Sequence, residues 1–595
     1  MKRILFDIET DGLVPDLTKV HSLVLLDMDT EEELSCADQK GYTSIADGMS
    51  YLKSAELLAG HNIQGFDFPA LHKLFGFEYS GEIHDTLIMS RLVWSDLKNN
   101  DFEYIKKPRG ANFPRQLIGS HSLKAWGLRL GNHKDGYSDG WEEWSEAMQT
   151  YCVQDCRANL TFYKFIMSKK PSAQSVKLEH DFAHVIRKQE AHGFHFDEVK
   201  AHKLLATLQG RQAELNDELQ VAFKPWEIRE PFTPKVNNKA RGYVKGQLTY
   251  KVKEVVFNPA SRDHIADRLQ TLGWVAQAHT EQGKPKVDET VLSGLDYPEA
   301  ALLNEYLMLN KRIGQLAVGQ NAWLKKVQNG KIHGQVNTNG CSTSRCTHNR
   351  PNVAQTPSVN APYGTQCREL FHAPEGYSLV GADLSGLELR CLAHMMAKFD
   401  GGSYTNVVVN GDIHSVNQKA AGLPDRSSSK VFIYGFLYGA GAAKIGSIVN
   451  GTEKEGRKLI NKFMAATPAL RELKAAVAHR VKTKGFLLGL DGRVLPIRSP
   501  HSALNVLLQS AGALLAKQAT VFLYENLTIK GYKWGEDYAQ VAHVHDEVQL
   551  IARKEIAEDV GREAVKSFQL AGEHFNFRCP ITGEFKVGNN WADTH

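Results

Sequence analysis

The chain has few cysteines, and they do not form the pattern of a metal-binding or disulfide scaffold. Its eight cysteines are scattered over 595 residues, with no Cys-x-x-Cys pair. Zinc-binding modules and disulfide-rich secreted domains place their cysteines at short, regular spacings. A reduced, intracellular protein is therefore the simplest interpretation.

Long apolar runs and a secretory leader are also missing. No apolar run approaches the ~20 residues that a membrane helix needs. The start MKRILFDIET is basic, but Asp7 interrupts its apolar run too early for a signal peptide. We therefore expect no membrane association.

The sequence has no internal repeat, no long low-complexity tract and no strong net charge. With 42% hydrophobic and 23% charged residues, it is neither largely disordered nor fibrous. A chain of 595 residues is too long for one hydrophobic core, so we expect three to five structural units. The net charge of +4 indicates no class of partner by itself.

Positive charge is instead concentrated in one segment. Residues 235–253 include two glycines but no acidic residue. The segment is either a solvated loop or a flexible basic loop that follows a phosphate backbone. Its cations are Lys235, Lys239, Arg241, Lys245, Lys251 and Lys253.

Hydrophobic periodicity divides the chain into regions. Residues 1–165 alternate strand-like runs, such as RILFDIE and SLVLLDM, with helical ones, which predicts an α/β domain. KKPSAQS at 169–175 is typical of a linker. Helical patterns follow at about 176–225 and 261–328, and from 331 onward short strands mix with long helices.

Acidic residues recur in the first region. Asp7 and Glu9 in FDIET would point to the same face of a strand. Their mutual repulsion makes a divalent cation a natural partner; the alternative is two exposed acids at a strand end. HNIQGFDFPAL places Asp67 where a helix would begin, and YCVQD places Tyr151 and Asp155 on one helical face. Four carboxylates and a tyrosine in this order suit two metals ~4 Å apart that activate water for phosphodiester hydrolysis.

The motifs DIE, HNxxxxD and YxxxD resemble those of the proofreading 3′–5′ exonucleases that use four acids and a tyrosine. This resemblance implies an RNase H-like domain. It implies that Asp7, Glu9, Asp67 and Asp155 bind metals and that Tyr151 orients the attacking water.

A second group of acids lies in the C-terminal half. SLVGADLSGLELRCLAHMM (378–396) predicts a buried strand that ends at Asp383, followed by a helix that presents Glu388. Open sheets place ligands at such strand ends, although Asp383 capping the helix is the alternative. VAHVHDEVQL (541–550) sets His545, Asp546 and Glu547 within an apolar run, where carboxylates are rarely buried without a cation.

DRSSSKVFIYGFLYGAG (425–441) is the strongest single motif. Arg426, Lys430, Tyr434 and Tyr438 follow at four-residue steps, so on a helix they form one stripe that drifts by only ~40° per step. Pro424 and Asp425 suit the start of this helix, and the glycines at 439 and 441 suit its end. Two cations followed by two aromatic rings suit a triphosphate and a base. The alternative is a solvated amphipathic face.

The Arg-xxx-Lys-xxx-Tyr-Gly pattern resembles the fingers-helix signature of family-A DNA polymerases. TSRCTHNRPNVAQTP (343–357), DLSGLELR (383–390), GDIH (411–414), SPHSALNVLLQSAGA (499–513) and VHDE (544–547) come in the order of that family. FIYGFLYGAG and NWADTH are similar to the replicative polymerases of short-tailed lytic bacteriophages.

The resemblance implies a multidomain fold of α/β and α+β type, in which an RNase H-like exonuclease domain precedes a right-hand polymerase. We expect the exonuclease domain at 1–168 and a thumb at 176–330 that carries a short basic loop at 225–255. The palm is expected at 331–405 and 500–595, and the fingers at 406–499.

The resemblance also implies two-metal nucleotidyl transfer. Asp383, Asp546 and the backbone carbonyl of Leu384 would hold two Mg²⁺ ions, and two more would occupy the exonuclease site; Mn²⁺ is expected to substitute. The resemblance implies that His414, Arg426 and Lys430 contact the phosphates of the incoming dNTP. Tyr434 would pack beside its sugar and base, and Tyr438 would lie by the template base. Glu388 would act as a steric gate against a ribose 2′-OH. A tyrosine at position 434 predicts ready incorporation of dideoxynucleotides.

Further residues are implied to contact DNA. Contacts in the minor groove check pairing without reading sequence, because its acceptors are similar for all correct pairs. The residues implied there are Arg345, Gln355, His501, Asn505 and Gln509. His545 would lie near the primer end, and Glu547 would support Asp546 from outside the metal site.

The implied role is replication of phage DNA in the host bacterial cytoplasm, on primer–template DNA with dNTPs. A phage helicase–primase and a single-stranded DNA-binding protein are expected partners. In a thioredoxin-recruiting relative a long loop is inserted between the thumb helices. Residues 225–255 are too short for it, so host thioredoxin is not expected, and this loop is expected to touch DNA or dock another processivity factor. Because the chain begins at the exonuclease motifs, no 5′ nuclease domain is expected.

Two other classes remain as alternatives. A single-subunit RNA polymerase shares the palm and the fingers helix, but the exonuclease acids and Glu388 argue against it. A non-catalytic nucleic-acid-binding relic is opposed by the presence of all six metal-binding acids.

Overall fold

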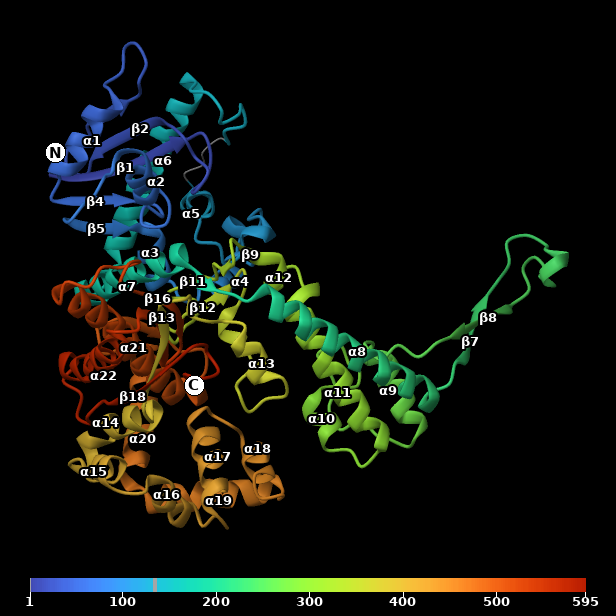
Figure 1. Ribbon diagram of the computed structural model, residues 1–595. Helices are drawn as coiled ribbons and strands as arrows, with labels where there is room; N and C mark the ends of the chain where they lie inside the picture. Colours follow the sequence, from blue (N-terminus) through green and yellow to red (C-terminus); the bar gives the residue numbers. More distant parts are fainter. Residues whose placement is uncertain (1, 132–135) are drawn as a thin grey trace. The chain divides into compact units, whose positions relative to one another are not determined.

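The computed structural model describes residues 2–131 and 136–595, which form two compact units (Figure 1). Unit 1 contains Met1–Phe194, Gly334–Thr356 and His372–His595, and unit 2 contains His195–His333 and Pro357–Phe371. Every residue expected in either active site belongs to unit 1.

The N-terminal part of unit 1 is an α/β domain, which confirms the prediction from alternating strand-like and helical runs. Its sheet has the order β3–β2–β1–β4–β5, in which β1 to β3 are antiparallel and β4 and β5 are added in parallel. The strands are β1 (Arg3–Thr10), β2 (Val20–Asp27), β3 (Glu33–Cys36), β4 (Leu57–Gly60) and β5 (Glu82–Asp85). The helices are α1 (Ile45–Ser54), α2 (Asp67–Phe75), α3 (Thr86–Val93), α4 (Leu97–Tyr104), α5 (Leu123–Leu130) and α6 (Glu146–Ser168).

Side chains of β1 alternate between two hydrophobic cores. Phe6 packs in the core that includes residues of α1 and α2, whereas Leu5 packs in the core that includes α3, α5 and α6. Asp7 and Glu9 are two and four residues after Leu5, so they lie on the same face as Leu5. The alternation therefore directs both acids toward α6.

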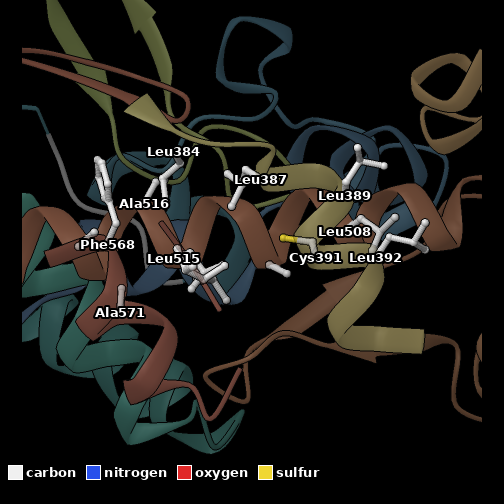
Figure 2. Close-up of a cluster of buried hydrophobic side chains, with 14 of the residues drawn as sticks. Leu384, Leu387, Leu389, Cys391, Leu392, Leu508, Leu515, Ala516, Phe568 and Ala571 are labelled. Atoms are coloured by element: carbon white, nitrogen blue, oxygen red, sulfur yellow. The ribbon is translucent and has the colours of Figure 1, made fainter. Parts of the chain in front are cut away.

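The C-terminal part of unit 1 is built on an antiparallel sheet of order β16–β17–β13–β18. Buried side chains of the neighbouring helices form one core with it, as Figure 2 shows. The elements here are β11 (Gln335–Asn337), β12 (Thr347–Asn349), β13 (Tyr377–Leu384), α14 (Leu387–Asp400), α21 (Ala503–Ile529), β16 (Tyr538–Val544), β17 (Glu547–Arg553), α22 (Ala557–His574) and β18 (Gly583–Gly588).

Helix α21 is more apolar than the unbroken apolar runs in its sequence indicate. The segment Pro500–Ile529 is long and apolar enough, by length and composition, to cross a membrane. However, 83% of its most apolar window is buried inside the protein, where Leu508 and Leu515 join the core of Figure 2. The polar residues that interrupt the helix hid this core element from a search for unbroken runs.

The region expected as fingers is helical. Asp425 caps α17 (Arg426–Leu437) through a hydrogen bond from the Ser428 N–H, and Gly439 beyond its end has φ +76°. This confirms the predicted start and end of the helix. The other elements are α15 (Ser403–Asn410), α16 (Ile413–Ala421), α18 (Ala442–Ser447), α19 (Glu453–Ala466), α20 (Pro468–Lys484), β14 (Phe486–Leu488) and β15 (Val494–Pro496).

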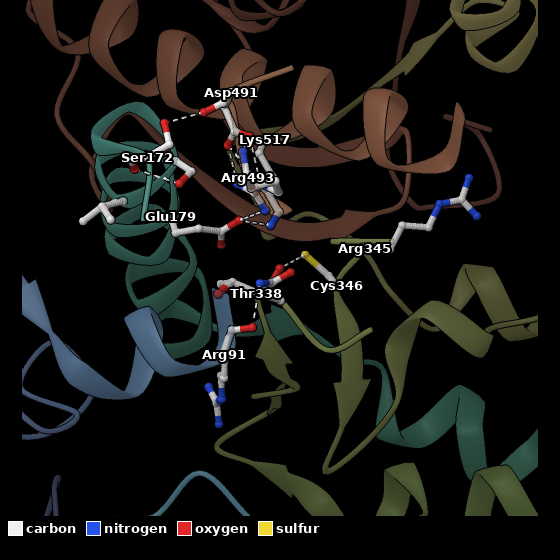
Figure 3. A network of polar contacts seen from close by, with 12 residues as sticks. Arg91, Ser172, Glu179, Thr338, Arg345, Cys346, Asp491, Arg493 and Lys517 are labelled. Carbon is white, nitrogen blue, oxygen red and sulfur yellow. Dashed lines mark hydrogen bonds and ion pairs between the residues drawn. The ribbon is translucent and has the colours of Figure 1, made fainter. Parts of the chain in front are cut away.

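A buried ionic cluster connects distant parts of unit 1 (Figure 3). Glu179, on α7 (Ala173–His192), accepts hydrogen bonds from Arg493 at 2.5 Å and from Lys517 at 2.6 Å. Arg493 also pairs with Asp491 at 2.6 Å, and all four side chains are at most 1% exposed. Burial opposes ionisation of Glu179, but the two cations outweigh it and hold its pKa below the ordinary value.

In unit 2, the basic segment expected as a loop forms a β-hairpin. Strand β7 (Trp226–Phe232) pairs antiparallel with β8 (Thr249–Val255), and the six cations of 235–253 are exposed. Gly242 and Gly246 adopt φ +67° and +77° at the tip. Both faces of these strands are exposed, so TYKVKEV has no buried apolar face to mark it as a strand in the sequence.

The remaining elements of unit 2 are mostly helical. They include a hydrophobic core to which α8 contributes Leu219 and α11 contributes Leu303. The elements are α8 (Glu198–Ala222), α9 (Arg262–Thr271), α10 (Glu289–Ser293), α11 (Pro298–Ile313), a π-helical turn (Gly314–Val318), α12 (Trp323–Lys326), β9 (Val327–Gln328), β10 (Lys331–Ile332) and α13 (Gly364–Glu369), and β6 (Phe194–His195) leads into the unit.

Candidate active sites

The first candidate site lies where β1 meets α6. One ligand atom from each of Asp7, Glu9 and Cys152 lies within 4.8 Å of the other two. The Cys152 thiol donates to the Asp7 carbonyl oxygen at 3.4 Å, and its sulfur is 3.9 Å from Asp7 Oδ2. The structure therefore brings the two acids of the DIE motif together with a thiol that sequence reasoning did not assign to the site.

Asp67 adds a third acid to this site. It is the first residue of α2 and is 2% exposed, and its Oδ1 has no hydrogen-bond partner among the described residues. Burial, together with the charges of Asp7 and Asp85, raises the pKa of Asp67 well above its ordinary value. A buried, orphaned carboxyl oxygen beside other acids fits the role of a cation ligand.

Tyr151 and Asp155 lie one turn apart on α6. Burial and the charges of Glu9 and Asp7 raise the pKa of Tyr151 to about 12. Its hydroxyl is therefore protonated at neutral pH and can donate a hydrogen bond to a water or an oxyanion. Asp155 is 9% exposed.

Asp85 is a positioning residue that sequence reasoning missed. It caps α3, and its carboxylate also accepts hydrogen bonds from the backbone N–H groups of Asn62 at 2.9 Å and Gln64 at 3.1 Å. These contacts hold the loop that leads to Asp67. The signal in the sequence was His-Asp-Thr after a strand, which is typical of a helix cap.

The second candidate site lies at the end of β13. Asp383 is in register with Glu547 of β17, and Asp546 occupies the turn between β16 and β17. The Leu384 N–H donates to the Asp546 carbonyl oxygen at 3.1 Å, which holds the two chain segments together. The predicted strand before Asp383 and the predicted hairpin around His545–Asp546 are both confirmed.

Crowding of acids perturbs both aspartates. Burial and the charges of Asp546 and Glu547 raise the pKa of Asp383 to about 7. Burial and the charge of Glu388 raise the pKa of Asp546 to about 6. Two carboxylates destabilised in this way, beside the Leu384 carbonyl, make an all-oxygen donor set of the kind that Mg²⁺ prefers.

Glu547 differs because protein groups already hold its carboxylate. Its Oε1 accepts hydrogen bonds from Trp591 Nε1 and Gln549 Nε2, each at 2.6 Å, and its Oε2 lies 3.1 Å from His595 Nδ1. Burial opposes ionisation, but these hydrogen bonds outweigh it and lower the pKa of Glu547. Trp591 and His595 were not assigned to the site from the sequence, since they are more than forty residues away along the chain.

The residues expected at the dNTP site line α17 and its neighbours. Arg426 and Lys430 are exposed, and the rings of Tyr434 and Tyr438 are stacked with centroids 6.5 Å apart. The imidazole of His414, on α16, lies 6.5 Å from the Tyr434 ring. The stripe predicted from the four-residue spacing is therefore present on one helix.

Glu388 joins this stripe to the residues expected to contact DNA. The Tyr438 hydroxyl donates to Glu388 at 2.6 Å, and Arg345 lies 3.7 Å from the same carboxylate. The Asn505 side chain donates to the Tyr438 carbonyl oxygen at 3.4 Å. His545 has a left-handed φ of +59°, and burial and Arg345 lower its pKa.

The other three residues expected in the minor groove lie on separate segments. Gln355 ends the short helical turn Val353–Gln355, and His501 lies in the turn Pro500–Ser502 that precedes α21. Gln509 is partly exposed on α21, one turn after Asn505. The shared helix places Asn505 and Gln509 on one face.

Known proteins match both halves of the chain. The model of DNA polymerase family A matches residues 236–593, and that of the RNase H superfamily matches residues 4–167. DNA-directed DNA polymerases of Escherichia phage T7 and Enterobacteria phage T3 are each 39% identical; the first alignment covers 100% of both chains and the second 99% of both.

A solved structure has the same fold. It is the POL domain of Pol1 from M. smegmatis in complex with DNA primer-template and dNTP. The TM-score is 0.73, with 17% sequence identity, and the match covers 99% of this chain and 96% of the other. The expected fold, an RNase H-like domain followed by a polymerase domain, is thereby confirmed. The chain therefore belongs to DNA polymerase family A, as a DNA-directed DNA polymerase of the phage type that carries an RNase H-like domain.

Proposed function

We propose that this protein is a replicative polymerase that extends a primer 3′-OH with dNTPs by two-metal nucleotidyl transfer and proofreads with a 3′–5′ exonuclease. The observation that carries the proposal is the hydrogen bond from the Leu384 N–H to the Asp546 carbonyl oxygen. It brings together two aspartates whose pKa values are both raised. Asp383, Asp546 and the Leu384 carbonyl would hold the Mg²⁺ ions. When bound, these ions lower the pKa of the primer 3′-OH and stabilise the pyrophosphate that leaves.

The residues of α17 bind and orient the incoming nucleotide in this proposal. Arg426 and Lys430 are exposed cations that would pair with the triphosphate, and His414 would donate to it. Tyr434 would pack beside the sugar and base. Glu388, held by Tyr438, would exclude a ribose 2′-OH and so select dNTPs.

Arg345, Asn505 and the neighbouring polar residues would follow the primer–template. Arg345 and Asn505 both connect to the Tyr438–Glu388 pair, so a distorted base pair would disturb the groups that hold the nucleotide. Gln355, His501 and Gln509 would extend these contacts along the minor groove.

In the N-terminal domain, Asp7, Glu9, Asp67 and Asp155 would hold two Mg²⁺ ions, for which Mn²⁺ would substitute. Tyr151 would orient the attacking water through its protonated hydroxyl. The orphaned Asp67 oxygen supports this assignment because a bound cation would give that oxygen a partner.

Paired variants test both activities in one preparation. Asp546→Asn should reduce Mg²⁺-dependent primer extension by at least about 100-fold and leave 3′ hydrolysis of single-stranded DNA intact. Asp7→Asn should reduce 3′ hydrolysis and leave primer extension intact. The activity that each variant keeps shows that it is folded. Loss of both activities in either variant would contradict separate sites, and faster extension with rNTPs than with dNTPs would favour an RNA polymerase instead.

The proposed setting is phage DNA replication in the cytoplasm of the host, with a helicase–primase and a single-stranded DNA-binding protein. The hairpin β7–β8 would touch DNA or dock a processivity factor other than thioredoxin. Primer extension on a long template with and without host thioredoxin tests this point. A large gain in product length with thioredoxin would contradict it.

A further inference from the structure

Cys152 lies at the junction of β1 and α6, and the proposed exonuclease mechanism gives it no role. Its side chain is fully buried, so it is not an incidental surface thiol. It lies on α6 directly after Tyr151, and its sulfur faces Asp7. Buried cysteines most often serve as small hydrophobic side chains, but this one shares its surroundings with carboxylates.

The distances suit a shared ion. A zinc-class ion with an S bond of about 2.3 Å and an O bond of about 2.1 Å separates tetrahedral donors by roughly 3.6 Å. The sulfur of Cys152 is 3.9 Å from Asp7 Oδ2, and the Glu9 carboxylate completes a set within 4.8 Å. Small side-chain shifts would therefore place three donors around one ion.

A second observation points independently to a ligand at this place. The Oδ1 atom of Asp67, 2% exposed, has no hydrogen-bond partner among the described residues. The Asp67 carboxylate is hydrogen-bonded to the backbone N–H of Ile8, the residue between Asp7 and Glu9 on β1, so it lies beside these two acids. A cation there would give the orphaned oxygen a partner and would offset the repulsion among the acids.

We propose that Cys152 is a sulfur donor of the exonuclease metal site, so that Asp7, Glu9 and Cys152 together bind a thiophilic divalent cation such as Zn²⁺. This inference rests on the proposed function, in that the acids of the site bind metals. Binding replaces the S–H bond of Cys152 by a sulfur–metal bond, and the proton leaves to solvent. The hard ion Mg²⁺ gains little from sulfur, so the thiol selects for zinc-class ions over Mg²⁺.

Cadmium provides a direct probe, because a Cd²⁺–thiolate bond gives an ultraviolet charge-transfer band. The full-length protein is titrated with Cd²⁺, and Zn²⁺ affinity is measured by calorimetry in parallel. Cys152→Ser should lose the band and bind Zn²⁺ on the order of tenfold or more weakly. Cys156→Ser is the matched control: its thiol is equally buried one turn later on α6 but donates to the Val24 carbonyl oxygen at 3.6 Å, and this variant should keep the band.

Asp7→Asn provides a second variant, which should also weaken Zn²⁺ binding if the sulfur and the acids share one ion. A band that persists in Cys152→Ser, or Zn²⁺ affinity equal to that of the parent, would overturn the inference. Circular dichroism and the thermal midpoint show whether each variant is folded.

Hydrolysis by the parent protein with Mg²⁺ separates this inference from the proposed function. If hydrolysis is absent and the cadmium band depends on Cys152, the proposed exonuclease activity is refuted, but the proposed metal site with its sulfur donor is supported. If hydrolysis is present and the band does not depend on Cys152, only the role of the thiol fails.

Discussion

Removing the charge of Glu179 should destabilise the protein far more than a change at the surface of the same helix. The buried cluster of Figure 3 contains two acids, Glu179 and Asp491, and two cations, Arg493 and Lys517, so its net charge is zero. Glu179→Gln keeps the size of the side chain but leaves one uncompensated positive charge. All four side chains are at most 1% exposed, so water cannot compensate for it.

The magnitude follows from that burial. Breaking a buried ion pair by removing one partner costs about 3–5 kcal/mol in the free energy of unfolding. Lys177 and Asp181 form the control pair on α7: they are 2.7 Å apart, but their side chains are 75% and 33% exposed. Lys177→Ala should cost at most about 1 kcal/mol. Urea titration followed by circular dichroism measures both differences.

A double variant tests whether uncompensated charge is the cause of the instability. Lys517→Met introduced into Glu179→Gln restores a neutral cluster. Methionine can fill most of the space of the lysine, whose Nζ lies 5.5 Å from the centroid of the Phe182 ring. The double variant should therefore return to within about 2 kcal/mol of the parent. If it is as unstable as Glu179→Gln or worse, uncompensated charge is not the cause of the lost stability.

Three further outcomes concern the polymerase site. Tyr434→Phe should lower the incorporation of dideoxynucleotides relative to dNTPs by roughly tenfold, the worth of one hydrogen bond, in single-nucleotide extension assays; equal rates for the two proteins would refute it. Glu388→Ala should raise rNTP incorporation by about tenfold or more, since it removes the proposed gate, and unchanged selectivity would assign selection elsewhere. Trp591→Phe removes the N–H donor to Glu547 and should cost about 1–3 kcal/mol of stability in urea titrations. The pKa of Glu547 is lower in the folded protein than its value of about 4.3 in the unfolded chain, so ionised Glu547 stabilises the fold above that pH. This stabilisation is lost as the pH falls through the folded pKa, so Trp591→Phe should make stability depend less steeply on acidic pH. An identical dependence in the parent and the variant would contradict this role of Trp591.

Local patterns predicted the elements that carry the main site residues. Apolar strand residues before Asp383, the two strand halves around Asp546 and the cap at Asp425 all depend on near neighbours in the chain, and the structure has each of them. The hairpin at 225–255 was missed because both of its strands are exposed on both faces and so carry no buried apolar face. The membrane-like composition of α21 was missed because polar residues interrupt its apolar run.

Contacts between distant residues were out of reach of such patterns. Trp591 is 44 residues from Glu547, and Lys517 is 338 residues from Glu179, so no local spacing indicates either contact. Asp85 likewise looked like an ordinary helix cap, although it also holds the loop before Asp67.

The sequence by itself determined which side chains carry charge, where the strands and helices that bear them begin, and the family whose motifs they match. Only the tertiary structure decided which of those charges meet. In the folded protein the Leu384 N–H donates to the Asp546 carbonyl oxygen, and Trp591 donates to the carboxylate of Glu547. The thiol of Cys152 lies beside Asp7. The physical reason is that pKa shifts, orphaned oxygens and shared ion sites arise from burial and proximity, which depend on how distant segments pack.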